Sequence, residues 1–395
     1  MKEPLWTKDF IFVSIIQFVL MLSMYGLFVT LPIYATQQYD ASVSMGGLVA
    51  SIFIIGALLA RLVTGKKAGE YGSKKMLVIG SSILVIATLL YFVTVSVEMM
   101  LTVRFLHGIG FGIATTATGI IVAQVMPIAR SGEGIGYFSL GVVLAIAVGP
   151  FIGIGIVDQW GYNWLFIFTI IMTIVSFSLA ILIKKPAGEV LYKASRGFKL
   201  QHYFAKKAVP VAFSMFIMAL AYSSILSFLT SYTQEIGIGA VSAYYFLIYA
   251  GMILLSRPFT GPLIDRKGGN AVAYPALVLY AIGMIILSQM QMPWQLFVAA
   301  AFIGLGYGNF QSTTQALAIK IVPREEVGLA TSTYFIFLDL GLGFGPLLFG
   351  SLIPYVGYSG LYLIMTILIL INIFGYYLLH GRKDHSYQET STLRI

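Results

Sequence analysis

The chain has 395 residues, of which 58% are hydrophobic, 10% are charged and none is cysteine. A soluble domain of this size does not need so large an apolar fraction, and the absence of thiols excludes disulfides and cysteine-based metal sites. The net charge of +9 does not indicate a nucleic-acid partner, because the basic residues follow the joints between apolar runs and do not gather on a solvated domain.

Apolar runs of about 20 residues, long enough for a helix to cross a hydrocarbon core about 30 Å thick, recur along the chain. They lack the alternating pattern of barrel strands, so we expect transmembrane helices. The first run is long enough to span and precedes no small-residue cleavage site, so we expect it to remain as a helix. Twelve spans are expected, at residues 10–32, 44–64, 76–97, 99–125, 133–157, 163–183, 208–232, 241–263, 271–290, 294–321, 328–354 and 358–379.

Lysine and arginine residues lie in every other joint between these spans. They precede the first span, they separate the second from the third, and they are dense in the segment 184–207 between the sixth and the seventh. By the positive-inside rule, we expect both termini in the cytoplasm of a protein that crosses the cell (plasma) membrane many times. Residues 185–207 are expected to form a basic cytoplasmic linker beside membrane lipids, either as a plain tether or with a regulatory role.

One pattern occurs twice, at an offset of 196 residues. The offset pairs Arg61 with Arg257, aligns the glycines at 108, 110 and 112 with those at 304, 306 and 308, and continues to the end of the fifth and eleventh spans. Each copy has an even number of spans, so both have the same orientation, related by an axis along the membrane normal. The repeat predicts two six-helix halves, residues 1–184 and 208–395, which is the plan of a transporter.

Two loops carry related motifs, "GKKAGEYGSKK" after the second span and "GPLIDRKGG" after the eighth. They resemble the loop signature G-x-x-x-D-R-x-G-R-R of the major facilitator superfamily. "RFLHGIGFG" from Arg104 resembles the family's motif in the fourth span, and "GPFIG" from Gly149 resembles the fifth-span motif associated with its proton-driven exporters of drugs and metabolites. The resemblance covers every expected span and implies an all-α integral membrane fold with twelve transmembrane helices in two six-helix halves.

The first of these loops departs from the signature. Gly69 and Glu70 stand where the family usually has Asp and Arg, whereas the second loop keeps both as Asp265 and Arg266. In the family this Asp holds its loop against the amino end of a helix from the opposite half and stabilises the outward-facing state. The resemblance implies that Asp265 acts on the start of the fifth span, and it leaves open whether Glu70 acts on the eleventh. The predicted latch comprises Gly65, Glu70, Gly72, Gly261, Asp265, Arg266 and Gly268.

Three titratable side chains inside the spans are candidates for proton coupling. Asp339 lies midway along the eleventh span, where an ionised group costs roughly 2.5–3.5 kcal/mol, so it either carries a proton or ties helices together through hydrogen bonds. Arg104 matches the arginine that the resemblance links to proton transfer, and His107 lies one turn further along the same face. The alternative is that Arg104 reaches the outer headgroups and that His107 only packs.

Two further sets of residues are predicted. The resemblance places a substrate cavity among the first, fourth, seventh and tenth spans, whose polarity suits a neutral or cationic amphipathic molecule or serves only interhelical hydrogen bonds. The cavity residues are Gln17, Tyr25, Thr115, Thr116, Tyr222, Ser224, Asn309, Gln311 and Gln315. The residues expected to allow close helix packing and bending are Gly149, Pro150, Gly153, Gly341, Gly345 and Pro346.

No arrangement of nucleophile, base and orienting group indicates an enzyme, and no phosphate-binding loop indicates a nucleotide-driven pump. We therefore predict a monomeric secondary transporter without cofactor or metal, which exports a small molecule against protons by alternating access. A symporter that imports a sugar or another nutrient would use the same frame. A receptor or scaffold built on a transporter fold is the alternative from another class.

Overall fold

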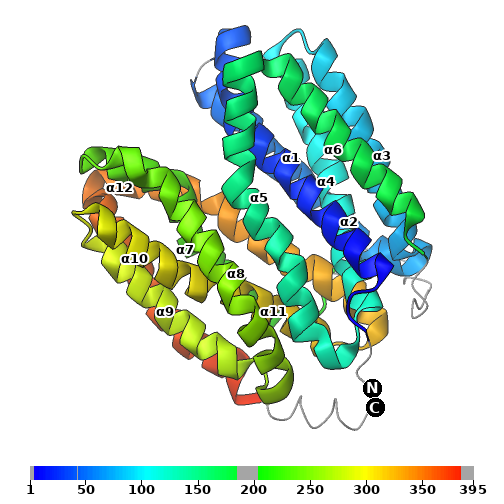
Figure 1. Cartoon of the computed structure of the whole chain (residues 1–395), viewed down its shortest axis with the longest axis vertical. Coiled ribbons are helices and arrows are strands. Elements are labelled where there is room, and N and C mark those ends of the chain that lie inside the picture. Colours follow the sequence, from blue (N-terminus) through cyan, green and yellow to red (C-terminus); the bar gives the residue numbers. More distant parts are fainter. Residues whose placement is uncertain (1–3, 42, 185–202, 384–395) are drawn as a thin grey trace. The chain divides into compact units, whose positions relative to one another are not determined.

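The computed structural model describes residues 4–41, 43–184 and 203–383, and the helices of this part follow the predicted spans (Figure 1). Most of the predicted linker, residues 185–202, lies outside the described residues. The first six spans form α1 (Lys8–Gln38), α2 (Val43–Tyr71), α3 (Ser73–Leu90), α4 (Val97–Val125), α5 (Ser131–Trp160) and α6 (Tyr162–Leu182). The short 3-10 turn η1 (Tyr91–Val93) follows α3, and the short 3-10 turn η2 (Ile128–Arg130) precedes α5.

The second copy contains two departures from six simple helices. Its tenth span is divided into α10 (Pro293–Ile303), the π-helix η5 (Gly304–Gly308) and α11 (Asn309–Lys320). Its last two spans join as α12 (Val327–Leu379), interrupted where Gly357 has φ 67°. The remaining helices are α7 (Val209–Glu235), α8 (Ser242–Lys267) and α9 (Asn270–Ser288). Eleven described segments are long and apolar enough to cross a membrane, and the divided tenth span completes the twelve that were predicted.

Helix ends follow from local sequence. The Thr7 side chain accepts a hydrogen bond from the Phe10 N–H at the start of α1, and Ser96 does the same for Met99 at the start of α4. Gly72 before α3 and Gly268 after α8 have φ 90° and 84°, which residues with a Cβ rarely adopt. These two glycines are repeat partners, so the duplicated sequence is also a duplicated backbone geometry.

The glycines of the fourth and tenth spans set the distances between helices. A Cβ on Gly108 of α4 would collide with the carbonyl oxygen of Phe53 in α2. A Cβ on the repeat partner Gly304 would lie 2.7 Å from the carbonyl oxygen of Tyr249 in α8, and Tyr249 is the repeat partner of Phe53. The close packing of α4 on α2 therefore recurs in the second copy, as expected for a duplicated unit.

The chain divides into two compact units, which differ from the sequence halves at two short segments. The described residues of Met1–Pro127, Gly141–Ala205 and Pro323–Thr333 form the first unit. The second unit comprises those of Ile128–Leu140, Lys206–Val322 and Tyr334–Ile395. The first turns of α5 thus belong to the second unit, and the first turns of α12 belong to the first unit. Within the first unit, α4 also packs on α3 (Figure 1).

Candidate functional site

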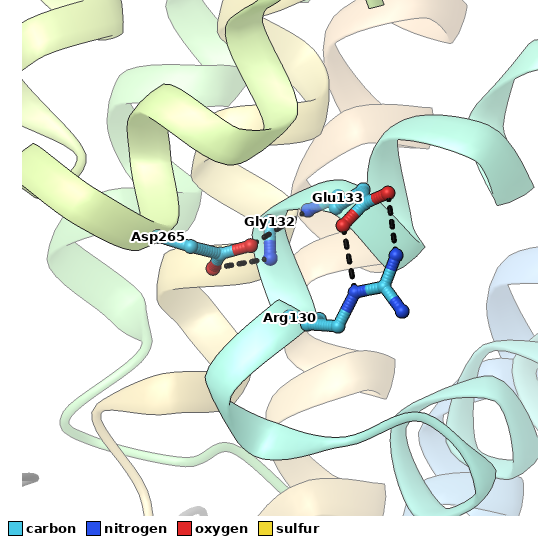
Figure 2. A network of polar contacts seen from close by, with 4 residues as sticks. All are labelled: Arg130, Gly132, Glu133 and Asp265. Carbon is cyan, nitrogen blue, oxygen red and sulfur yellow. Dashed lines mark hydrogen bonds and ion pairs between the residues drawn. The ribbon is translucent and has the colours of Figure 1, made fainter. Parts of the chain in front are cut away.

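The carboxylate of Asp265, at the end of α8, binds the amino end of α5 within the second unit. Figure 2 shows the side chain facing two consecutive backbone N–H groups. Oδ1 accepts a hydrogen bond from Gly132 at 2.8 Å, and Oδ2 accepts one from Glu133 at 3.0 Å. The first N–H groups of a helix lack partners within the helix, so an acid there satisfies them and interacts favourably with the helix dipole. Asp265 is therefore a capping residue supplied by another helix.

Two further charged contacts surround this cap. Lys320 at the end of α11 lies 2.8 Å from Oδ1 of Asp265, whose side chain is only 8% exposed. Arg130 forms two bonds of 2.8 Å to the carboxylate of Glu133, so that this acid is neutralised beside the aspartate (Figure 2). A Cβ on Gly261, one turn before Asp265, would lie 2.7 Å from the Cα of Glu133, so the two backbones touch. Charge and close contact together hold α8 on α5.

The corresponding place in the first unit has no such carboxylate. Gly69 occupies the position of Asp265, and Glu70 is ion-paired with Lys67 of its own helix at 2.5 Å. The backbones still approach each other, because a Cβ on Gly65 would collide with Ser332 near the start of α12. The hydroxyl of Ser332 donates a hydrogen bond to the carbonyl oxygen of Arg61. The first copy thus keeps the close contact between the two helices and lacks the acid that caps the helix start in the second copy. Arg266, which follows Asp265 in the second loop, is exposed.

Arg104 and His107 lie together in the first unit and are fully buried. Nε of Arg104 donates a hydrogen bond to the Val49 carbonyl oxygen at 3.1 Å, and its guanidinium lies 4.5 Å from the ring centre of Phe53. Nδ1 of His107 lies 2.8 Å from the hydroxyl of Tyr91. Arg104 therefore points into the helix packing. Tyr91 was not among the predicted site residues, and its position in a short turn after an apolar helix gave no signal for it.

Asp339, the other coupling candidate, lies in the part of α12 that belongs to the second unit. Asp339 is half-buried. Gly341, two residues later, packs closely on α7, where a Cβ would lie 2.5 Å from the Phe216 carbonyl oxygen. An acid of intermediate exposure beside a tight helix contact is compatible with both roles that the sequence left open, and its part in proton coupling stays a prediction.

Two buried arginines that were noted only as repeat partners form the same contact in both units. Nη1 of Arg61 donates a hydrogen bond to Thr116 at 3.2 Å, and Arg257 donates one to Ser312, the repeat partner of Thr116. Arg257 also bonds the Gly308 carbonyl oxygen at 3.1 Å, at the end of the π-helix. A π-helix leaves backbone groups without regular partners, and the guanidinium satisfies one of them. The repeat itself was the signal that could have identified this pair.

Asn309 is the centre of a hydrogen-bond network at the same π-helix. Its amide nitrogen donates to the Leu305 carbonyl oxygen at 2.8 Å, and its oxygen accepts from Ser256 at 3.1 Å and Thr260 at 3.2 Å. Asn309 is 3% exposed. These bonds tie α8 to the tenth span and use most of the hydrogen-bonding capacity of the amide, so a contact of Asn309 with substrate stays a prediction.

The other predicted cavity residues fall into the two units. Gln17 accepts a 2.6 Å hydrogen bond from Thr118, which joins α1 to α4, while Nε2 of Gln17 and of Gln315 are buried without a partner among the described residues. Tyr222 stacks on Tyr307 with ring centres 4.1 Å apart. The hydroxyls of Thr115 and Ser224 bond carbonyl oxygens of their own helices, whereas Tyr25 and Gln311 are half-buried.

The predicted small residues lie at close helix contacts. A Cβ on Gly149 would lie 2.7 Å from Cβ of Tyr25, and one on Gly153 would lie 2.8 Å from Cα of Gly26, both against α1. A Cβ on Gly345 would collide with Ser223 of α7. Pro150 lies inside α5, and Pro346 lies inside α12 with a side chain outside the described part. A role of these residues in bending stays a prediction. Among the described residues, no three acids or histidines lie together in a group that could hold a metal ion.

Comparisons with known proteins agree with this architecture. The sequence profile described as Major Facilitator Superfamily matches residues 13–293 and again 211–393. The chain is 28% identical over 371 residues to "Multidrug resistance protein MdtG" of Citrobacter koseri, covering 90% of each chain. It is 26% identical over 342 residues to "Uncharacterized MFS-type transporter MJ1560" of Methanocaldococcus jannaschii, covering 84% of this chain and 88% of that one.

Two solved structures have the same fold. One is a bacterial homologue of the iron transporter ferroportin in its outward-facing state, with a TM-score of 0.77, 13% identity and coverage of 95% of this chain and 100% of that one. The other is the human organic anion transporter MFSD10, with a TM-score of 0.73, 14% identity and coverage of 93% and 99%. The repeated helices, the loop contacts and the match along nearly the whole chain lead to one conclusion: this multi-pass membrane protein belongs to the Major Facilitator Superfamily.

Proposed function

We propose that this protein exports small amphipathic molecules in exchange for protons by alternating access. The observation that carries the proposal is the similarity along 90% of the chain to proteins named as multidrug resistance proteins, within a family of membrane transporters. The importer and the receptor, which the sequence left open, have no comparable support. The protein is proposed to act as a monomer in the plasma membrane, in contact with its lipids and with both termini in the cytoplasm.

In the proposed cycle, the two six-helix halves rock about a central site, and Asp265 acts as a latch. Its bonds to Gly132 and Glu133 stabilise the state in which the cytoplasmic ends of α5 and α8 are together. That state is outward-facing in the proposed scheme. Opening toward the cytoplasm breaks the two bonds and leaves the first N–H groups of α5 to water.

Proton coupling is assigned to Asp339, with Arg104 and His107 as the second group. Asp339 is the one candidate that can lose a negative charge by taking up a proton, which changes the charge of α12 between the steps of the cycle. Arg104 and His107 are fully buried in the first unit, so a change in their protonation or contacts requires helix movement. Substrate and proton then compete for the inward-facing protein, so that substrate binding from the cytoplasm is accompanied by proton release.

The test uses purified protein in proteoliposomes with an imposed pH step. Accumulation of a fluorescent amphipathic amine and of its uncharged acetamide is followed in the direction opposite to proton flow, with a protonophore added as the control. Uphill movement that the protonophore abolishes supports the proposal. Movement of radiolabelled sugars together with protons, without any movement of the amphipathic probes, would favour the importer and end the proposal.

A further inference from the structure

The buried charges of the described part of the chain are unbalanced. Arg61, Arg104 and Arg257 are each at most 2% exposed, and no aspartate or glutamate among the described residues is buried to that degree. A buried charge is costly unless it is paired and hydrogen-bonded. Each guanidinium therefore needs partners, and the three arginines differ in how many they have.

In the described part of the chain, Arg104 is the arginine in which both terminal nitrogens lack hydrogen-bond partners, whereas Arg257 lacks a partner only at Nε. Its Nη1 and Nη2 atoms are buried and have no hydrogen-bond partner among the described residues. Only Nε is bonded, to the backbone of Val49, while the aromatic face of Phe53 covers the group and the Tyr91 hydroxyl lies near it. Arg257, by contrast, donates hydrogen bonds to Gly308, Asn309 and Ser312. Two parallel N–H donors at the end of a planar guanidinium form the fork that binds a carboxylate with two hydrogen bonds.

The surroundings of Arg104 are built from polar and aromatic groups that the fold does not require. Tyr91 bonds His107, and the Tyr91 ring stacks on Phe166 at 5.3 Å with an interplanar angle of 14°. The ring of Phe53 meets that of His107 edge-on at 5.3 Å. At the repeat positions of Arg104, His107 and Tyr91, the second copy has Ala300, Ile303 and Leu287. The same helix packing forms there with apolar side chains, so packing alone does not explain the first set.

We propose that Nη1 and Nη2 of Arg104 bind the carboxylate of an amphipathic substrate, with the rings of Phe53 and Tyr91 beside it. This inference rests on the proposed export function and gives its substrate a negatively charged group. The sequence alone favoured a neutral or cationic molecule, because it showed one acid inside the spans and did not show which arginine has two terminal nitrogens without partners. Because Arg104 is fully buried, the carboxylate enters when the helices around Phe53 move during the transport cycle.

The first experiment measures binding to the full chain in nanodiscs by titration calorimetry. The ligands are 4-octylbenzoate and 4-octylbenzamide, which share size and apolar surface and differ in charge. We expect the benzoate to bind more tightly, and Arg104→Gln to weaken benzoate binding about 10- to 100-fold while benzamide binding changes less than about threefold. The control Arg61→Gln removes a buried arginine that already has a partner, and it is expected to keep the ratio of the two affinities.

A second experiment does not depend on the Arg104 variant folding. The chain has no cysteine, so Val49→Cys introduces a single thiol beside Arg104 and keeps the backbone carbonyl that Nε of Arg104 bonds. 4-Octylbenzoate is expected to slow maleimide labelling of this thiol at least fivefold, and 4-octylbenzamide is expected not to slow it. If the benzoate and the benzamide slow the labelling equally, the carboxylate site is overturned. If sodium chloride slows the labelling as much as the benzoate does, the site is one for free chloride and the proposal is also overturned. Proton-driven movement of an uncharged probe tests the export function separately, so each failure can be told from the other.

Discussion

Replacing Asp265 by asparagine removes the charge of the cap on α5 and keeps its shape. The carboxylate accepts two backbone hydrogen bonds of 2.8 and 3.0 Å, and an amide has one oxygen to offer and turns its NH2 group toward the second N–H. Hydrogen bonds to a charged group contribute about 1.5–3 kcal/mol, against about 0.5–1.5 kcal/mol for neutral ones. The Lys320 contact adds little, because the lysine side chain is 27% exposed. We expect a loss of about 1–2 kcal/mol, a factor of about 5–30.

The assay places one reporter at the contact itself. Ser131, the first residue of α5, is 3% exposed, and Ser131→Cys is a nearly isosteric change in a chain without other thiols. Asp265→Asn in this background should raise the rate of maleimide labelling about 5- to 30-fold, because α5 is released from α8 more often. Lys320→Gln should raise it less than about fivefold. Gly69→Asp, at the repeat partner of Asp265, should leave it unchanged. Equal labelling rates in all four proteins would show that Asp265 does not hold α5.

Three further predictions concern coupling and packing. Asp339→Asn should abolish uphill transport driven by a pH gradient while exchange without a gradient continues, because the amide has no proton to release; near-normal uphill transport in proteoliposomes would leave Asp339 a structural role. Gly268→Ala should cost about 1–2 kcal/mol because φ is 84°, whereas Gly251→Ala, in an open position of α8, should change stability by less than about 1 kcal/mol, as measured by thermal unfolding in one detergent. Gly304→Ala should lower thermal stability by more than either, because its Cβ would lie 2.7 Å from the Tyr249 carbonyl oxygen; an unchanged melting temperature would contradict this.

The spans and the duplication could be predicted because each depends on a signal that one sequence carries. A membrane helix needs a long apolar run, and a duplicated unit repeats its glycines at one offset. The π-helix η5 could not be predicted, since the aligned glycines of α4 have the same spacing within a regular α-helix. Which backbone hydrogen bonds are rearranged depends on neighbours such as Arg257 and Asn309, which belong to different helices.

The candidate site was predictable to different degrees. Asp265 matched a loop signature, and its contact with α5 could be predicted from the position of this aspartate and of the start of that helix. The environment of Arg104 depends on which atoms of Val49, Phe53 and Tyr91 surround it, and these residues are ordinary apolar or aromatic positions in the sequence. Every residue has a backbone carbonyl, so the sequence does not show which carbonyl accepts a hydrogen bond from Arg104. For that reason the missing partners of Nη1 and Nη2 are visible only in the structure.

The contacts of Gly108 and Gly304 have a consequence for how such a protein diversifies. In both copies the glycine approaches a carbonyl oxygen, so the spacing of the helices depends on main chain that every amino acid shares. The facing residue has changed from Phe53 in one copy to Tyr249 in the other without loss of the contact. After a gene duplicates, mutations can therefore alter the side chains that meet a cargo in one copy while the other keeps its own, and the inherited scaffold tolerates both.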